Sequence, residues 1–264
     1  MSTVLDRIVA SKREEIAYAK TQRDLGSLVQ AAFQGPEIRS FINALRGHDY
    51  VRLIAEVKRA SPSKGLIRPQ FEPVDIALAY QAGGAAAISV LTDEPFFQGR
   101  LDYLTAIRNR VDIPVLRKDF ILDPYQVYEA RVAGADAVLL IAECLEGEEL
   151  IELFELIEQL GMTALIELYD PIHLERVLAT GTKLVGVNNR DLHTFAVDLE
   201  HVILLREQIP DDVMVVAESG IFTATDVHKI HCANIQAMLV GESLMRQQDI
   251  QQAVISLLQP PFAE

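Results

Sequence analysis

The chain has 264 residues, half of them hydrophobic, and a formal net charge of −14. It can therefore bury a large core, and its length is normal for a single α/β barrel. The negative charge argues against a nucleic-acid-binding protein or a partner of anionic membranes. The N-terminus lacks a signal peptide and no apolar run approaches a membrane span, so we expect a cytoplasmic protein. Cys144 and Cys232 are far apart and are expected to be reduced, small apolar residues.

Residues 1–48 are expected to form a helical extension ahead of the main fold. Apolar residues recur at helical spacing between positions 4 and 17, and further helices are predicted over Leu25–Phe33 and Glu37–Leu45. The extension is either a separate arm or a cover over one mouth of the following domain. The sequence alone does not choose between the two.

Residues 49–264 alternate between short β-rich runs and amphipathic helical segments. Strands are predicted at Arg52–Val57, Ala86–Val90, Val115–Arg117, Ala137–Ile141, Thr163–Leu168, Leu184–Val187, Val213–Ala217 and Ala237–Val240. Helices are predicted at Val74–Ala82, Leu101–Arg110, Pro124–Ala133, Gly147–Leu160, Pro171–Ala179, Leu199–Gln208, Ala224–His231 and Gln247–Leu258. Eight strand–helix units predict an α/β fold of the (β/α)8 TIM barrel type. The alternative, a doubly wound open sheet, would usually carry a G-x-G-x-x-G fingerprint after its first strand, and the sequence has none.

The first strand and its loop, Leu53–Ile67, combine charge with an anion-friendly turn. Glu56 and Lys58 are two residues apart, which places both side chains on one face of a strand. They form either a structural ion pair or the floor of an active site, because buried charges are costly unless they are paired or used. The following loop, Ser61–Gly65, is rich in hydroxyls and backbone N–H groups. A positive cluster accompanies it: Lys58, Arg59, Lys64 and Arg68.

Polar residues gather at the predicted carboxyl ends of the strands, which is where active sites of such barrels lie. They are Glu56, Lys58, Lys118, Glu167, Asn188, Asn189, Arg190, Glu218, Ser219, Gly220, Gly241, Glu242 and Ser243. Two lysines and several glutamates in one cavity indicate acid/base chemistry, and burial can bring a lysine pKa toward neutrality. The alternatives are a surface role for Lys118 and a structural ion pair for Glu167. Arg117 should point away from the cavity.

The loops after the last two strands favour a phosphate site. Ser219-Gly220 and Gly241-Glu242-Ser243 can present backbone N–H groups at a short helix start, with the backbone rather than the carboxylate of Glu242 facing the anion. The hydroxyl of Ser61 could reach the same phosphate, although these glycines could also be ordinary turn residues. The histidines lack metal-ligand spacing, so no metal site is predicted.

With these motifs assembled, the sequence closely resembles the indole-3-glycerol phosphate synthase family over essentially the whole chain. The motifs are IAEVKRASPSKG (54–65), VLTDEPFFQG (90–99), PVLRKDFILDPYQ (114–126), ALIEL (164–168), GVNNRDL (186–192), AESGI (217–221) and LVGESLM (239–245). The resemblance implies ring closure without a cofactor or metal. The substrate would be the phosphorylated aromatic molecule 1-(2-carboxyphenylamino)-1-deoxyribulose 5-phosphate. It also implies a monofunctional chain, which we expect to be a monomer.

The resemblance also implies roles for individual residues. Lys118 would be the general acid and Glu167 the general base or electrostatic stabiliser, with Lys58 and Glu56 sharing proton transfer in the dehydration. The residues that would position the hydroxyls and the carboxylate of the substrate are Asn188, Arg190 and Ser219. The phosphate would lie on Ser61, Gly220, Gly241, Glu242 and Ser243, and the aromatic ring in a slot lined by Leu91, Phe97 and Leu139.

Two other functions are compatible with parts of the pattern. Another phosphate-binding barrel enzyme, such as phosphoribosylanthranilate isomerase, would share the phosphate loops but not the set of Lys58, Lys118 and Glu167. A non-catalytic protein that kept the fold would be expected to have lost its acid/base residues, and all of them are present here.

Overall fold

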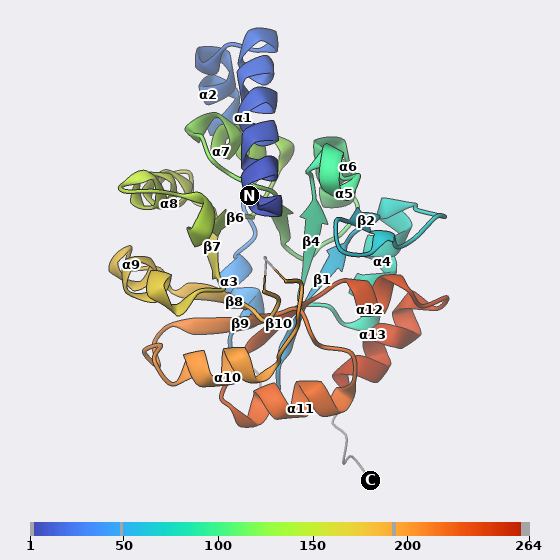
Figure 1. Cartoon of the computed structure of the whole chain (residues 1–264). Coiled ribbons are helices and arrows are strands. Elements are labelled where there is room, and N and C mark those ends of the chain that lie inside the picture. The colour runs from blue at the N-terminus through green and yellow to red at the C-terminus, as the bar shows by residue number, and fades with distance from the viewer. Residues whose placement is uncertain (1–2, 48–49, 192–193, 260–264) are drawn as a thin grey trace.

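The computed structural model describes residues 3–47, 50–191 and 194–259, and its centre is a closed barrel of eight parallel strands (Figure 1). The strands are β1 (Arg52–Val57), β4 (Ala87–Leu91), β5 (Val115–Lys118), β6 (Ala137–Ile141), β7 (Thr163–Leu168), β8 (Leu184–Asn188), β9 (Met214–Glu218) and β10 (Ala237–Val240). Each pairs with the next along the chain, and β10 closes the barrel on β1. The predicted (β/α)8 TIM barrel is confirmed, with strand boundaries displaced by no more than one residue.

Helices surround the barrel on its outer face (Figure 1). They are α4 (Pro73–Gly83), α6 (Leu101–Arg108), α7 (Pro124–Ala133), α8 (Glu149–Gln159), α9 (Leu174–Ala179), α10 (Glu200–Arg206), α11 (Ala224–Cys232) and α13 (Ile250–Leu258). Several are shorter than predicted. Helix α13, for example, begins at Ile250 because Asp249 caps it by accepting a hydrogen bond from the Gln252 N–H. Shorter segments complete the set: α5 (Glu94–Phe97), α12 (Glu242–Met245), η1 (Ala142–Cys144) and η2 (Pro171–His173).

The strands are buried on both faces, because helices cover the outside and side chains fill the inside. Strand β6, with the sequence AVLLI, is an example in which every residue is buried. Cys144 also lies in this buried region, whereas Cys232 is exposed. Both cysteines carry free thiols.

The predicted loop after β1 contains a small antiparallel hairpin. Strands β2 (Ala60–Ser61) and β3 (Gly65–Leu66) pair across a tight turn, in which Gly65 has a φ of +63°. Glycine adopts this left-handed conformation without steric cost. Because these strands have only two residues each, they carry no periodic pattern that sequence analysis could detect.

The N-terminal segment forms three helices: α1 (Val4–Gln22), α2 (Leu25–Phe33) and α3 (Phe41–Leu45). Helices α1 and α2 stand beside α7 at one side of the barrel (Figure 1). Helix α3 begins four residues later than predicted, because Ser40 caps it and the residues before it are extended. Ser2, His48, Leu192 and His193 lie outside the described residues.

A buried carboxylate ties this N-terminal segment to the barrel. Asp136, just before β6, accepts hydrogen bonds from the backbone N–H groups of Arg39 and Val115, both at 2.8 Å. Its other partner is the guanidinium of Arg108, whose Nη2 lies 3.2 Å from Oδ1. Burial acts to raise the pKa of Asp136, and these donors oppose it.

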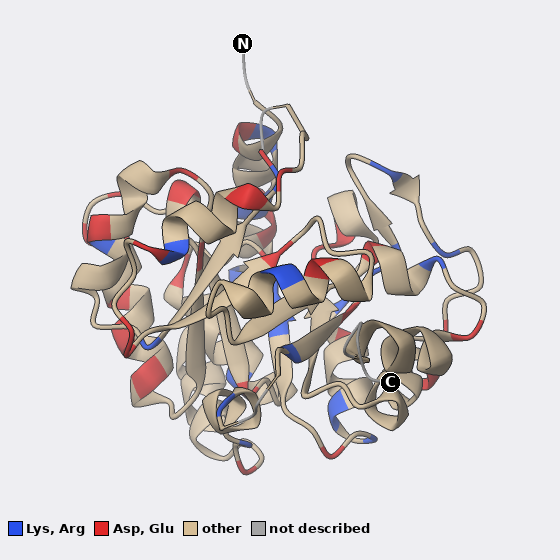
Figure 2. Ribbon diagram, turned by 90° about the horizontal axis from the view of Figure 1, so that it is seen from below, with Lys and Arg blue, Asp and Glu red and all other residues tan. Residues whose placement is uncertain are grey.

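Charged residues are interspersed around the outer helices and loops rather than gathered on one face (Figure 2). The net charge of −14 is therefore distributed over the surface. Within the described ranges, the chain has no helix long and apolar enough to cross a membrane.

Replacing Asp136 tests this link between the extension and the barrel. Asp136→Ala should lower the free energy of unfolding by about 3 kcal/mol, because it strands buried donors without their acceptor. Urea unfolding followed by circular dichroism measures the loss. The control is Asp212→Ala, which removes an exposed ion pair with Lys183 and should have a much smaller effect on the free energy of unfolding. Equal losses in the two variants would contradict this account of the link.

Candidate active site

One cavity opens at the carboxyl ends of the strands, and every residue to which the sequence analysis gave a catalytic or substrate-binding role lines it. They are Glu56, Lys58, Ser61, Leu91, Phe97, Lys118, Leu139, Glu167, Asn188, Arg190, Ser219, Gly220, Gly241, Glu242 and Ser243. These residues come from strands and loops far apart in sequence, and the closed barrel brings them together.

Lys118, the last residue of β5, lies at the centre of the site between two carboxyl groups. Its Nζ is 2.7 Å from Oε2 of Glu167 on β7 and 3.0 Å from Oε2 of Glu218 on β9. The lysine side chain is only 15% exposed, and both glutamates are buried. Lys118 is therefore not a surface lysine. Arg117, its neighbour, points outward and donates to the backbone oxygen of Gln126 on α7.

The barrel register explains why the carboxyl groups converge. Asn188 on β8 lies directly beside Glu218 on β9, so both side chains point to the same side of the sheet. Gly186 on β8 leaves the space that Glu218 needs, because a Cβ there would collide with its carboxyl oxygen. Gly241 leaves corresponding space for Glu56. These glycines act by being small beside a buried carboxyl group.

The three central groups hold different protonation states. Burial acts to lower the pKa of Lys118, but the charges of Glu167, Glu218 and Glu56 outweigh it and raise that pKa. The prediction that burial brings this lysine pKa toward neutrality was therefore wrong. Burial acts to raise the pKa of Glu167, yet the Lys118 ammonium lowers it overall. Burial and then the neighbouring Glu167 charge raise the pKa of Glu218 to about 8. At pH 7 the site accordingly holds an ammonium, a carboxylate and a neutral carboxylic acid.

The second charged pair lies on the β1 side of the cavity. Lys58, immediately after β1, forms an ion pair with Glu56, whose side chain is buried. The rest of the predicted positive cluster does not join them. Arg68 donates to the backbone oxygens of Met245 and Gln247, and neither Arg59 nor Lys64 lines the cavity. These residues are close in sequence but do not form one cluster, because the hairpin and the residues beside it direct their side chains apart.

Asn188 and Arg190 extend the network around Glu167. The amide Nδ2 of Asn188 donates to Oε1 of Glu167 at 3.0 Å, and its Oδ1 accepts from the Arg190 N–H at 3.0 Å. The Arg190 guanidinium donates to the backbone oxygen of Phe195 and lies 3.8 Å from Oε2 of Glu242. Arg190 thus remains a cation at the rim with only a long contact to a carboxylate.

The loops after β9 and β10 differ from the predicted pair of helix starts. Gly241 is the N-cap of α12, so a short helix does begin directly after β10. After β9 the chain instead makes a turn with positive φ at Ser219 (65°) and Gly220 (80°), and α11 begins only at Ala224. The Ser243 hydroxyl donates to the backbone oxygen of Ile221 and so links the two loops.

The carboxylate of Glu242 lies near three cationic side chains, one of which is Arg190 of the cavity lining at 3.8 Å. It accepts a hydrogen bond from Arg246 at 3.1 Å and has a longer contact with Lys64 at 3.8 Å.

Apolar residues form the other wall and part of the cover of the cavity. Leu91 lies at the end of β4, Leu139 on β6 and Phe97 at the end of α5. The ring of Phe97 lies 6.2 Å from that of Phe120. Helix α1 adds Val4, Leu5 and Ile8 to the lining. Of the two alternatives left open for the N-terminal segment, the structure therefore favours a cover over the mouth.

Glu218 was predicted to lie at a strand end, but no role in the site was predicted for it from the sequence. The signal was the alternation in β9, MVVAE, which puts Glu218 on the interior face. Its partner could not be identified without the register between strands. The described residues contain no group of three or more His, Cys, Asp or Glu side chains arranged to hold a metal ion.

A buried lysine held by carboxyl groups at the carboxyl mouth of a barrel defines an acid/base enzyme of the (β/α)8 class. Comparison with known proteins identifies the family. The family model described as indole-3-glycerol phosphate synthase matches residues 5–257. The chain therefore belongs to the indole-3-glycerol phosphate synthase family, whose members are enzymes that catalyse a decarboxylative ring closure in tryptophan biosynthesis. The resemblance found in the sequence motifs is confirmed.

Individual relatives agree with this assignment. A protein of Rhodopirellula baltica named indole-3-glycerol phosphate synthase is 58% identical over 256 residues, which cover 97% of this chain and 99% of the relative. One of Paracidovorax citrulli with the same name is 48% identical, covering 94% and 96%. A solved N-acetylmannosamine-6-phosphate 2-epimerase from Clostridium perfringens has a TM-score of 0.63 at 16% identity, covering 82% of this chain and 96% of its own. That likeness supports the fold alone.

The raised pKa of Glu218 predicts how stability depends on pH. The folded chain holds this proton more tightly than the unfolded chain, so the contribution is fully present below pH 4.5 and is lost as the pH rises through about 8. The lowered pKa of Glu167 acts in the opposite direction, but only in acid. Glu218→Gln, which mimics the neutral acid, should therefore reduce the fall in unfolding free energy between pH 5 and pH 9. Urea unfolding across this range measures it, with Glu155→Gln on the exposed face of α8 as the control. An unchanged alkaline fall in Glu218→Gln would contradict the assignment.

Proposed function

We propose that this chain catalyses the conversion of 1-(2-carboxyphenylamino)-1-deoxyribulose 5-phosphate to indole-3-glycerol phosphate, with Lys118 as the general acid. The observation that carries this proposal is the position of the Lys118 ammonium, 2.7 Å from Glu167 and 3.0 Å from Glu218 in one apolar-walled cavity. The substrate carries a phosphate, a carboxylate and an aromatic ring. It therefore needs cationic groups, backbone donors and apolar surface together, and this cavity lining offers all three.

Ring closure requires a proton at the ribulose carbonyl oxygen. As the aromatic carbon that bears the carboxylate attacks the carbonyl carbon, a carbon–carbon bond forms and the oxygen gains negative charge. The Lys118 ammonium stabilises that charge and donates its proton, so the oxygen becomes a hydroxyl. This interaction is strongest in the transition state, which is the condition for raising the rate. The substrate carboxylate then leaves as carbon dioxide, and its bonding electron pair returns to the ring.

Dehydration completes the indole. A proton must leave the substrate and the new hydroxyl must depart as water. Glu167 is ionised and accepts a hydrogen bond from Asn188, so we assign it the role of general base or electrostatic stabiliser. The ion pair of Lys58 with Glu56 on the opposite wall shares proton transfer in this step. Glu218, neutral at pH 7, adds a second acid that the sequence-based proposal did not include.

The remaining contacts bind and orient the substrate. We assign the phosphate to the hydroxyl of Ser61 and to the loops of Gly220 and Gly241–Ser243, where backbone N–H groups stand at the start of α12. The rim guanidinium of Arg190 suits the substrate carboxylate, and Asn188 and Ser219 would position the hydroxyls. The aromatic ring would lie against Leu91, Phe97 and Leu139.

The proposal extends to the whole chain. Residues 1–48 would act as a cover that packs on the 49–264 barrel, in agreement with the contacts of Asp136 and the cavity lining from α1. We expect the chain to work as a cytoplasmic monomer. Gel filtration at micromolar concentration tests the monomer, which should elute near 29.3 kDa.

Turnover of the proposed substrate tests the function. Purified chain incubated with 1-(2-carboxyphenylamino)-1-deoxyribulose 5-phosphate should develop indole fluorescence and release one carbon dioxide per product. Phosphoribosylanthranilate is the comparison substrate. Its consumption without turnover of the carboxyphenylamino compound would replace this proposal with the isomerase.

Lys118→Met tests the role of the general acid. This substitution keeps the length of the side chain and removes the ammonium, so kcat should fall by about 10²- to 10⁴-fold. The substrate should still bind, because the phosphate and ring contacts remain; equilibrium binding to the inactive variant measures this. Lys183→Met, which removes an exposed lysine, is the control. Turnover near that of the unchanged chain would refute the assigned role.

A further inference from the structure

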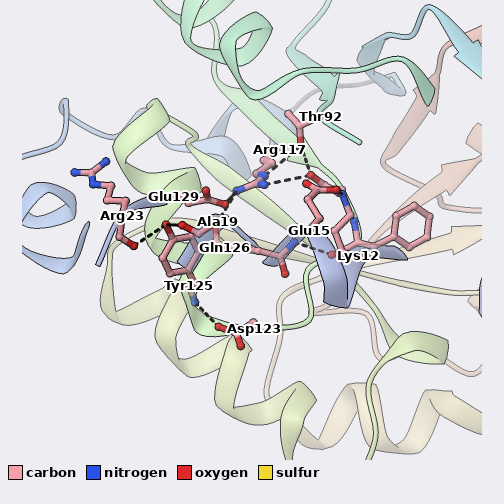
Figure 3. Close-up of polar contacts among 12 residues, drawn as sticks. Lys12, Glu15, Ala19, Arg23, Thr92, Arg117, Asp123, Tyr125, Gln126 and Glu129 are labelled. Carbon is pink, nitrogen blue, oxygen red and sulfur yellow. Dashed lines mark hydrogen bonds and ion pairs between the residues drawn. The ribbon is translucent and has the colours of Figure 1, made fainter. Parts of the chain in front are cut away.

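A second buried lysine lies outside the acid/base centre. Lys12, on α1, has no exposed surface, and its Nζ lies 2.9 Å from Oδ1 of Asp119 and 3.1 Å from Oδ2 of Asp93. It also lies 2.8 Å from Oε2 of Glu15 (Figure 3). Asp93 and Asp119 are themselves buried. A buried ammonium is costly to maintain, and here two buried carboxylates from the barrel offset that cost. This cluster joins the N-terminal helix to the barrel.

Asp119 connects Lys12 to the catalytic strand. It follows Lys118 directly at the end of β5, and its Oδ1 also accepts the Phe120 N–H at 2.8 Å. Its Oδ2 accepts the hydroxyl of Thr92 at 2.5 Å and the guanidinium of Arg117 at 3.2 Å. The backbone on both sides of Lys118 is therefore held by one charged cluster, of which Lys12 is the part contributed by α1.

Asp93 connects Lys12 to the aromatic wall. Its Oδ1 accepts the Phe96 N–H at 2.9 Å and so caps α5, the short helix that ends at Phe97. Lys12 contacts the other oxygen, Oδ2, for which the hydrogen bonds within the described residues provide no donor besides this ion pair. One ammonium thus contacts both the segment that carries the proposed acid and the segment that carries the proposed ring contact.

The position of Lys12 on α1 also determines how this helix lies over the cavity. Ile8, one turn earlier on the same helix, lines the cavity together with Val4 and Leu5. The far end of the helix is held by uncharged hydrogen bonds, because the hydroxyl of Tyr125 on α7 bonds to the backbone oxygens of Ala19 and Arg23 at 3.0 and 3.1 Å. Lys20 pairs there with Asp123 at the surface, with 44% of the lysine side chain exposed. The buried cluster is therefore the fixed point of α1 next to the cavity.

We propose that Lys12 is a positioning residue for the ring-closing reaction: it holds α1 over the cavity and fixes, through Asp119 and Asp93, the segments that carry Lys118 and Phe97. This inference rests on the proposed function. The elevated pKa of Lys12, which its burial opposes and its carboxylate neighbours produce, keeps the group charged at every pH at which the enzyme would be assayed. Lys12 does not contact the reacting atoms and transfers no proton.

Lys12→Met tests the inference, with Lys20→Met on the same helix as the matched control. We expect kcat to fall by ~10- to 100-fold in Lys12→Met, because small displacements of reacting groups are costly. Inhibition by inorganic phosphate should change by less than about twofold, since most of the groups proposed to bind phosphate, Gly220 and Gly241–Ser243, lie in the loops after β9 and β10. No hydrogen bond or ion pair among the described residues joins those two loops to the cluster. A merely structural role would move both quantities together. Lys20→Met should leave both unchanged.

A second variant keeps the inference testable if Lys12→Met does not fold. Lys12→Met leaves buried carboxylates uncompensated, so Lys12→Met/Asp93→Asn removes one charge of each sign and should fold while kcat stays low. A kcat within about twofold of the unchanged chain, a parallel loss of phosphate inhibition, or failure of both variants to fold would overturn the inference. Turnover by the unchanged chain separates the two proposals: its absence refutes the function, whereas its presence together with normal turnover by Lys12→Met refutes only the role of Lys12.

Discussion

The contact of one lysine with two carboxyl groups is the constraint on which the rest of this structure depends. Lys118, Glu167 and Glu218 come from three different strands, and only a closed barrel brings their side chains within 2.7 to 3.0 Å. Three charges could not coexist there without cost, so one carboxyl keeps its proton. The same buried contact that would be expensive in a structural core leaves an acid, a base and an ammonium ready for proton transfer.

The barrel and its N-terminal helix meet this constraint together. Glycine at positions 186 and 241 makes room for the buried carboxyl groups, and α1 covers part of the mouth with Val4, Leu5 and Ile8. A second ion cluster, centred on Lys12, joins this cover to the strand that carries Lys118. The net negative charge of the chain is a separate property, because the positive groups that matter for the site, Lys58, Lys118 and Arg190, line the cavity.

Much of this arrangement was predictable because barrel periodicity is visible in the sequence. The strand order placed Lys118, Glu167 and Asn188 at one mouth. The contact partners of each side chain depend on the register between strands, so they could not be predicted. For that reason the predicted direction of the Lys118 pKa shift was wrong. The pKa depends on how many carboxylates surround the ammonium, and this number follows from the register. Lys12 had a signal that was not used: it lies between Ile8 and Ile16 on the apolar stripe of α1, where a lysine requires a buried partner.

The central claim is that Glu218 keeps its proton beside the ionised Glu167 and the Lys118 ammonium, and carbon-13 NMR of the glutamate side-chain carboxyl groups tests it most directly. In protein labelled at glutamate Cδ, one resonance should titrate with a midpoint near pH 8 and disappear in Glu218→Gln. Glu167 should remain ionised down to acid pH in the same spectra. If every glutamate carboxyl group instead titrated below about pH 5, Glu218 would be ionised at neutral pH, and this account of the site would be wrong.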